Sequence, residues 1–222
     1  MNKLVLNHPT LVLLYGYPGA GKTFFSRQLC EDIQAAHVQG DRIRAELFEQ
    51  PRYDRQENEI VSHLMNYMAS EFLSAGMSVI YDTNAMRLNQ RRELRDLARS
   101  CKAQSMLIWF QIDFESAYSR LMRRDRRKAD DRYAAQLDRN AFNGILGGMQ
   151  NPEMTEDYAV ISGKHTYQTQ RSTVMRKLYE HKLIMSNDVN PRVVRPELVN
   201  LVPHPTSMGG RVDQSRRNIS IR

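Results

Sequence analysis

Short runs rich in apolar and β-branched residues alternate with longer amphipathic segments along the first 185 residues. The short runs have the length of buried strands and cover residues 11–15, 37–39, 78–81, 105–112 and 159–161. In the longer segments apolar residues recur three or four positions apart, which predicts helices over residues 21–35, 42–50, 56–75, 91–100, 115–122 and 169–183. Strands that alternate with helices predict a mostly parallel five-stranded sheet covered on both faces, a three-layer α/β/α fold.

Polar positions follow three of the predicted strands directly. Gly16 comes after the first strand, Asp41 after the second and Asp82 after the third. Because parallel sheets bind ligands at the carboxyl ends of their strands, we expect these three positions to share one cleft.

A phosphate-binding loop follows the first strand and reads Gly16-Tyr17-Pro18-Gly19-Ala20-Gly21-Lys22-Thr23, which is the Walker A pattern. Its glycines let the backbone curve so that several N–H groups converge on one anion. In such loops the lysine reaches the β- and γ-phosphates and the hydroxyl residue binds Mg²⁺, which assigns these roles to Lys22 and Thr23. The helix that includes Phe24 adds its positive N-terminal end. Residues 16–24 are therefore predicted to bind ATP with Mg²⁺.

Two carboxylates are candidates for the chemistry. Asp82 is predicted to hold Mg²⁺, directly or through water, and its alternative role is to cap the next helix. Asp41 precedes Arg44 by three positions, so both lie on one face of the helix that starts there. The carboxylate can accept the proton of an attacking hydroxyl, and the guanidinium can bind an anionic group of the substrate. The alternative is a helix-capping aspartate beside a surface arginine.

An arginine-rich segment supplies a third element. Residues 120–132 contain seven basic and three acidic side chains, and Arg123 and Arg127 are four positions apart. A helix through them would place both guanidiniums on one face, where they could stabilise the charge of phosphoryl transfer. A helical segment over about residues 120–135 could close over ATP as a lid that excludes water. The alternative is a solvated basic helix.

The net charge of +7 is concentrated in this segment and in residues 190–222, each with a surplus of four positive charges. Residues 186–222 also hold four of the eight prolines and the pair Gly209-Gly210. We therefore divide the chain into a domain over residues 1–185 and a basic tail over residues 186–222. The tail is interpreted either as an extended arm that is packed on the domain or partly disordered, or as a basic arm for nucleic acid or a partner protein.

Composition bears on the cellular setting. The two cysteines, Cys30 and Cys101, favour reduced thiols over a disulfide framework. No apolar run has the length of a membrane helix, and the N-terminus lacks a signal-peptide pattern. We therefore expect a cytoplasmic protein with no membrane partner.

Four segments, taken in order, resemble the P-loop kinase family of the phage-type polynucleotide 5′-kinase: Gly16 to Thr23, Asp41 to Phe48, Val79 to Asn84, and Arg123 through Arg127. That family also covers ATP-binding proteins described as AAA-domain proteins, with zeta toxin and chloramphenicol phosphotransferase as more distant relatives. The resemblance extends over about residues 10–165.

The resemblance implies a role for each matching residue. Lys22 and Thr23 would bind the ATP phosphates and Mg²⁺, and Asp41 would be the general base. Arg44 would contact a substrate phosphate, and Arg123 and Arg127 would form the lid over the donor. Asp82-Thr83-Asn84 resembles an element that lies beside the reacting centre in the family, which implies substrate contacts from Thr83 and Asn84.

The sequence therefore predicts a kinase that transfers the γ-phosphoryl group of ATP to a substrate hydroxyl, with Lys22, Asp41, Arg123 and Arg127 as catalytic residues. A polynucleotide 5′-hydroxyl suits the basic segments, and a nucleoside, a sugar or another metabolite is the alternative acceptor. A nucleotide-dependent binding protein without transferase activity is the third hypothesis. The sequence leaves the oligomeric state open.

Overall fold

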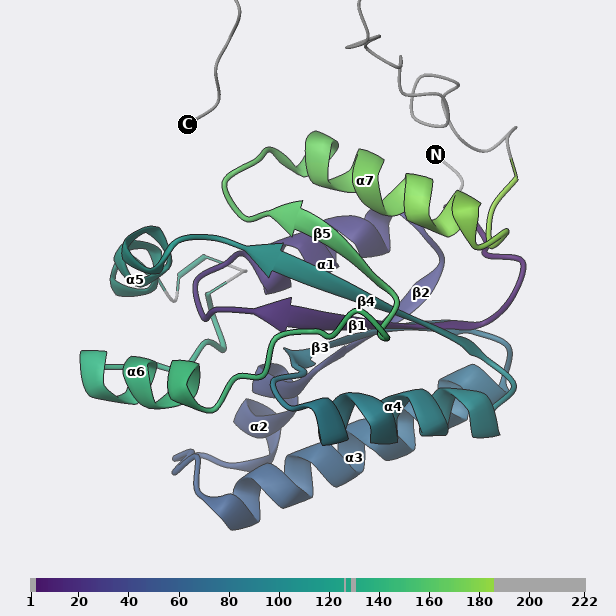
Figure 1. The fold of residues 1–222 in the computed structure, drawn as a ribbon. Helices are drawn as coiled ribbons and strands as arrows, with labels where there is room; N and C mark the ends of the chain where they lie inside the picture. The colour runs from purple at the N-terminus through teal and green to yellow at the C-terminus, as the bar shows by residue number, and fades with distance from the viewer. Residues whose placement is uncertain (1–2, 126, 129–130, 186–222) are drawn as a thin grey trace, which may run out of the picture.

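The chain forms a five-stranded sheet in which every neighbouring pair of strands is parallel (Figure 1). The structure, a computed structural model, describes residues 3–125, 127–128 and 131–185. The strands are β1 (Thr10–Gly16), β2 (Ala35–Gln39), β3 (Ser78–Asn84), β4 (Gln104–Gln111) and β5 (Tyr158–Ser162), in the spatial order β2-β3-β1-β4-β5. The helices are α1 (Lys22–Asp32), α2 (Gly40–Leu47), α3 (Arg55–Ser74), α4 (Leu88–Ser100), α5 (Phe114–Met122), α6 (Arg139–Gly147) and α7 (Tyr167–Glu180).

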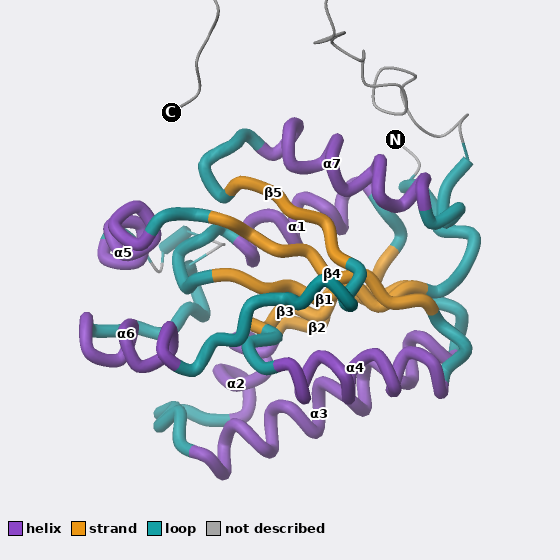
Figure 2. Tube along the Cα trace, in the orientation of Figure 1, coloured by secondary structure: helices purple, strands orange, loops and turns teal. Residues whose placement is uncertain are grey.

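The central strand β1 is buried on both faces of the sheet, which explains its continuous apolar sequence. Val12 and Leu14 face a core shared with α1 and α7, whereas Leu11 and Leu13 face a core shared with α3 and α4. Figure 1 shows these two pairs of helices on opposite faces of the sheet. The tube in Figure 2 shows α5 and α6 beyond the ends of the strands, on the side to which the β1 and β4 arrows of Figure 1 point. The three-layer fold predicted from the sequence is confirmed.

Two predicted features of the helices need correction. The sequence missed α6, a short helix capped by Asp138, whose Phe142 packs against Ala117 and Leu121 of α5. Conversely, α5 ends at Met122, and the described residues between it and α6 form turns and loops rather than the predicted helical lid. A helix continued to position 127 would align four arginines three or four positions apart, and like charges at that spacing repel one another. The predicted tail over residues 186–222 lies outside the described residues.

No helix within the described residues is both long and apolar enough to span a membrane. The thiols of Cys30 and Cys101 are both free, and burial raises the pKa of Cys30 to about 11. Cys30 is therefore protonated at neutral pH, which agrees with a packing role.

A buried ion pair fixes the segment that connects α6 to β5. The guanidinium of Arg91 in α4 is fully buried and donates to Glu156 at 2.7 and 2.9 Å. It also donates to the carbonyl oxygens of Ala85 and Gln150, at 3.0 and 2.9 Å. Burial alone would raise the pKa of Glu156, but the hydrogen bonds from Arg91 and Arg95 outweigh it and lower this pKa to about 2. The pair therefore joins α4 to the chain that follows α6.

We expect Glu156→Gln to lower the free energy of unfolding by about 3 kcal/mol, because the change leaves the Arg91 charge buried without its partner. Urea unfolding at pH 7 measures this loss. Since the pKa of Glu156 is depressed on folding from 4.5 to about 2, its contribution is complete above pH 4.5 and disappears as the pH falls towards 2.

Exposed Glu153 gives the matched control, and Glu153→Gln should change stability by less than about 0.5 kcal/mol. Equal stability of the two variants at pH 7 would contradict the importance of the ion pair.

Candidate active site

The phosphate-binding loop connects β1 to α1 and is packed closely against two other elements. A Cβ atom on Gly16 would lie 2.6 Å from the carbonyl oxygen of Phe110 in β4. Gly19 has a φ of +85°, and a Cβ there would overlap the carbonyl oxygen of Ala117 in α5. Both positions therefore require glycine, because each lacks space for a side chain and each has a positive φ that other residues rarely adopt.

The ammonium group of Lys22 lies inside this loop. It donates hydrogen bonds to the carbonyl oxygens of Gly16 at 2.7 Å and Tyr17 at 3.0 Å. Burial is the main cause that lowers the pKa of Lys22 to about 8, and the positive charge of Arg124 adds to it. Asp82 and Asp41 act in the opposite direction. Lys22 is therefore a cation held among carbonyl dipoles and within electrostatic reach of two carboxylates.

Asp82 lies within β3, not past its end as the sequence suggested, and joins three elements of the site. Its Oδ1 accepts a hydrogen bond from the Thr23 hydroxyl of α1 at 3.3 Å. Its Oδ2 lies 2.9 Å from Nε2 of His37 in β2. The parallel register that pairs Gln39 with Asp82 accounts for this convergence of strands. Sequence reasoning missed His37, because nothing in its local pattern points to a neighbour 45 residues away.

The pair formed by Thr23 and Asp82 fits a magnesium ion that is shared with phosphates. Mg²⁺ prefers oxygen ligands and is usually held by one or two protein groups, waters and the phosphates of its substrate. The Thr23 hydroxyl and a carboxylate oxygen of Asp82 are adjacent here. Within the described residues, no group of three or more His, Cys, Asp or Glu side chains could hold a metal by itself. Thr23 and Asp82 are therefore the residues that could hold such an ion.

Asp41 lies within electrostatic reach of the loop lysine Lys22 and of Asp82. It is the second residue of α2, which begins directly after β2. Burial and the negative charge of Asp82 raise the pKa of Asp41, while the cations Arg124, Arg44 and Lys22 oppose that rise. The carboxylate therefore shares one electrostatic environment with Lys22 and Asp82, as expected from its place after a strand.

The side chain of Arg44 is buried and is partly engaged by α3. Its guanidinium donates to Glu57 at 3.0 Å and to Asn58 at 2.5 Å, and it lies 4.7 Å from the centre of the Tyr53 ring. Glu57 also accepts hydrogen bonds from the backbone N–H groups of Arg52 and Tyr53. Arg44 thus ties α2 to the start of α3, while its charge still reaches Asp41.

Thr83 and Asn84, the last residues of β3, border the loop and α2. Oδ1 of Asn84 accepts a hydrogen bond from the backbone N–H of Gly16 at 3.2 Å. A Cβ on Gly40 would lie 3.6 Å from Cβ of Thr83, so the first residue of α2 sits directly against the strand end. Phe24 is 43% exposed at the first turn of α1.

The arginine cluster is arranged differently from the sequence prediction. Arg123 and Arg127 are exposed and do not share a helix face, because α5 ends before them. Arg124 is instead the half-buried arginine whose charge acts on both Lys22 and Asp41. It donates to the carbonyl oxygen of Ala135 at 3.1 Å and lies 3.9 Å from Asp131. The spacing of the arginines in the sequence could not identify Arg124, because its position in the site depends on the path of the chain after Met122.

A family model described as an AAA domain matches residues 11–152. The chain is also similar to L-seryl-tRNA(Sec) kinase of Methanococcus maripaludis, with 21% identity over 149 residues. That alignment covers 66% of this chain and 58% of the relative, so the chain spans less than two thirds of the length of the curated protein that it matches.

Solved kinase and nucleotide-bound structures share the fold. Kti12 of Chaetomium thermophilum in complex with ADP-AlF3 superposes with a TM-score of 0.60 at 15% identity, over 80% of this chain and 100% of that one. The APS kinase CysC of Mycobacterium tuberculosis, in complex with AMPPNP and APS, gives 0.56 at 17% identity over 78% and 98%. A gluconokinase of Sinorhizobium meliloti gives 0.55 at 12% identity over 79% and 93%. With the family match over well over half of its length, the chain belongs to the AAA-domain family and has a P-loop kinase-like α/β fold.

Proposed function

We propose that this protein is an ATP-dependent phosphotransferase that moves the γ-phosphoryl group of ATP to a substrate hydroxyl. One observation carries the proposal: the Asp41 carboxylate shares its electrostatic environment with the loop cation Lys22 and with the Thr23–Asp82 pair. A phosphate-binding loop alone would be compatible with many chemistries. A carboxylate at the phosphate end of the loop is the additional group that a hydroxyl acceptor needs.

The donor half of the site consists of the loop and two side chains. Backbone N–H groups of Gly19, Gly21, Lys22 and Thr23 would surround the phosphates, and the Lys22 side chain would contact the β- and γ-phosphates. Thr23 and Asp82 would hold Mg²⁺, which neutralises phosphate charge when it is bound. The contact between His37 and Asp82 would fix the orientation of that carboxylate.

Asp41 would act as the general base. Its pKa is raised above the ordinary value, so it accepts a proton more readily than an exposed aspartate does. As the acceptor oxygen forms its bond to the γ-phosphorus, the bond from that phosphorus to the β–γ bridging oxygen breaks and ADP leaves. The hydroxyl proton passes to Asp41, and Arg44, Thr83 and Asn84 would line the acceptor side.

Arginine side chains would stabilise the charge on the phosphoryl group in transfer. Arg124 is already in electrostatic contact with Lys22 and Asp41. We retain Arg123 and Arg127 as catalytic candidates that require the segment after α5 to close over the donor. Arg124 is a third catalytic candidate, and it would need the smallest movement to reach the phosphoryl group because its charge already acts on Lys22 and Asp41.

We propose a hydroxyl group as the acceptor and, more specifically, the hydroxyl of a polynucleotide. The named relatives include a seryl-tRNA kinase, a gluconokinase and an APS kinase, which support transfer to a hydroxyl group without fixing its carrier. Exposed basic side chains in and after α5 favour a polynucleotide hydroxyl such as a 5′ end: Arg120, Arg123, Arg127, Lys128 and Arg132. A small-molecule acceptor and a nucleotide-dependent binding protein are the competing outcomes of the tests below.

Transfer is tested with ATP labelled in its γ-phosphate, Mg²⁺ and a panel of acceptors: 5′-hydroxyl RNA, 5′-hydroxyl DNA, nucleosides and sugars. We expect label on a hydroxyl acceptor with the natural protein and none with Lys22→Ala. Asp41→Asn should lower kcat by about 100- to 10,000-fold, because it removes the base, and should leave ATP affinity nearly unchanged.

Glu46→Gln is the matched control, because this exposed carboxylate lies on the same helix as Asp41. It should retain full activity. ATP binding without label on any acceptor would instead support a nucleotide-dependent binding protein.

ATP affinity should fall as the pH rises through about 8, because Lys22 loses the charge that attracts the triphosphate. A group with this pKa is mostly protonated at pH 7 and mostly neutral at pH 9, so the Kd should increase by about tenfold between them. Calorimetric titration at several pH values measures the change. Lys22→Met should bind weakly with a flatter profile, and an equally steep profile in that variant would assign the titration to another group.

If the acceptor is a polynucleotide, its binding should weaken steeply with salt. Two to four phosphate contacts would give a slope of about −1.4 to −2.8 in a plot of log K against log salt concentration for a single strand. Fluorescence anisotropy of a labelled 5′-hydroxyl oligonucleotide measures this slope. An affinity that does not depend on salt would count against a polynucleotide acceptor.

A further inference from the structure

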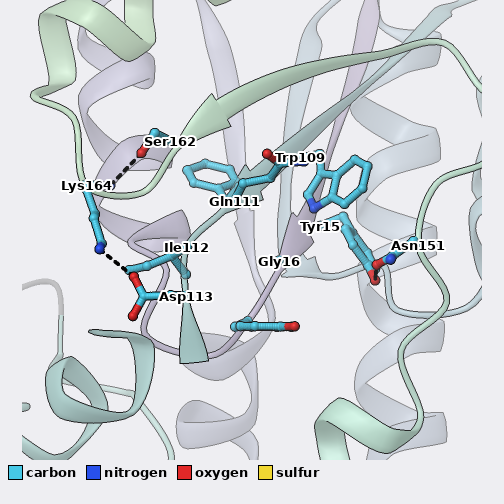
Figure 3. Close-up of a pocket in the computed structure, with 11 residues that line it drawn as sticks. Tyr15, Gly16, Trp109, Gln111, Ile112, Asp113, Asn151, Ser162 and Lys164 are labelled. Carbon is cyan, nitrogen blue, oxygen red and sulfur yellow. Dashed lines mark hydrogen bonds and ion pairs between the residues drawn. The ribbon is translucent and has the colours of Figure 1, made fainter. Parts of the chain in front are cut away.

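A pocket lies at the carboxyl ends of β1, β4 and β5, where it borders the start of the phosphate-binding loop (Figure 3). Its volume is about 440 Å³, which is in the range of pockets that hold small organic ligands. Its lining includes Tyr15, Tyr17, Trp109, Asp113, Asn151 and Lys164. Figure 3 shows Tyr15, Trp109 and Asn151 gathered on one side of this hollow and Asp113 and Lys164 on the other.

The aromatic side of the pocket is rigid. Trp109 is half-buried, and its ring meets the edges of Tyr15 and Tyr158 at centroid separations of 5.8 and 5.6 Å. Tyr15 is almost completely buried and its position is fixed. Trp109 and the half-buried Tyr17 therefore form an aromatic surface of fixed orientation in the pocket. Such surfaces bind flat ring systems by stacking.

One amide is oriented at the edge of that surface. Oδ1 of Asn151 accepts a hydrogen bond from the Tyr15 hydroxyl at 2.8 Å, which leaves the Nδ2 hydrogens directed elsewhere. Arg91 donates to the backbone carbonyl oxygens of Gln150 and Asn151, at 2.9 and 3.4 Å. The buried ion pair of Arg91 thus fixes the chain that carries this amide. An oriented amide beside a stacking surface suits a heterocycle with hydrogen-bonding groups on its rim.

A cation lies across the pocket. The ammonium of Lys164 is 2.5 Å from Asp113, and the hydrogen bond it donates holds the pKa of that carboxyl well below its usual range. Lys164 is more than half exposed. It can therefore also contact a phosphate carried by a ligand whose ring lies against Trp109.

The location of the pocket relative to the donor decides which ligand it serves. Lys22 is hydrogen-bonded to the carbonyls of Gly16 and Tyr17, and both residues also line this pocket. Since the lysine of such a loop contacts the β- and γ-phosphates, the pocket borders the reacting end of the triphosphate rather than its nucleoside end. The acceptor meets the donor at that end: its hydroxyl would face Asp41, and a group that extends past β1 from there would enter this pocket.

We propose that this pocket binds the nucleobase of the phosphoryl acceptor. The inference rests on the proposed phosphotransferase function and narrows its substrate class to nucleotides and nucleic-acid ends. The base stacks on Trp109 and Tyr17, its rim accepts a hydrogen bond from Asn151, and Lys164 contacts a neighbouring phosphate. Sugars and other alcohols without an aromatic ring would leave this pocket unfilled.

Trp109 is the single tryptophan of the chain, so its fluorescence reports on the pocket directly. The protein is saturated with a non-hydrolysable ATP analogue and Mg²⁺, excited where nucleobases do not absorb, and titrated with a 5′-hydroxyl dinucleotide. We expect saturable quenching. The matched compound whose 5′ base is replaced by hydrogen should compete at least about tenfold more weakly, because it cannot stack.

Tyr17→Leu should weaken dinucleotide binding by about tenfold, whereas Tyr17→Phe retains the ring and should stay within about twofold of the natural protein. Asn151→Ala tests the amide in the same assay. Thermal unfolding shows whether each variant is folded. If Asn151→Ala is unfolded, the comparison of Tyr17→Leu with Tyr17→Phe still tests the proposal.

Two results would overturn the proposal. One is the absence of quenching by any nucleoside or nucleotide acceptor. The other is quenching by the ATP analogue alone that blocks the dinucleotide, since that would assign the pocket to the donor base. Transfer to a ringless alcohol without quenching by nucleotides would overturn the pocket and leave the phosphotransferase function in place. Quenching without any transfer would retain the pocket and overturn that function.

Discussion

The buried ammonium of Lys22 is the interaction on which the site depends. A cation removed from water must be compensated, and here two loop carbonyls accept its hydrogen bonds while Asp82 and Asp41 supply negative charge. A triphosphate would add further compensation in the same place. Burial is the largest cause of the lowered pKa of Lys22, so a phosphate beside the ammonium would favour its charged form.

The parallel sheet brings the compensating groups together. β1 delivers the loop, β2 leads into α2 and Asp41, and β3 carries Asp82, so three carboxyl ends meet at one edge. The two apolar cores on either face of β1 hold these strands in register. On the other side of β1, the ends of β4 and β5 form the aromatic pocket. The strand order thus determines where the donor site, the general base and the proposed acceptor pocket lie.

Much of this arrangement could be predicted from local sequence. The strands, the loop and the positions of Asp41 and Asp82 follow from apolar runs and from residues next to strand ends, which need no knowledge of distant contacts. The contact between His37 and Asp82, the role of Arg124 and the pocket at Trp109 depend on register and on the path of the chain, so the sequence could not supply them. The end of α5 shows the same limit. The spacing of the arginines predicted a helix that continues past Met122, whereas repulsion between these like charges favours a helix that ends there.

Carbon-detected NMR titration of the Asp41 carboxyl group tests most directly whether Lys22 and Asp41 share one electrostatic environment. In the natural protein the positive charge of Lys22 lowers a pKa that burial has raised. Replacing Lys22 by methionine should therefore raise the pKa of Asp41 further. An unchanged pKa would mean that the two groups do not interact and would contradict the proposed transfer.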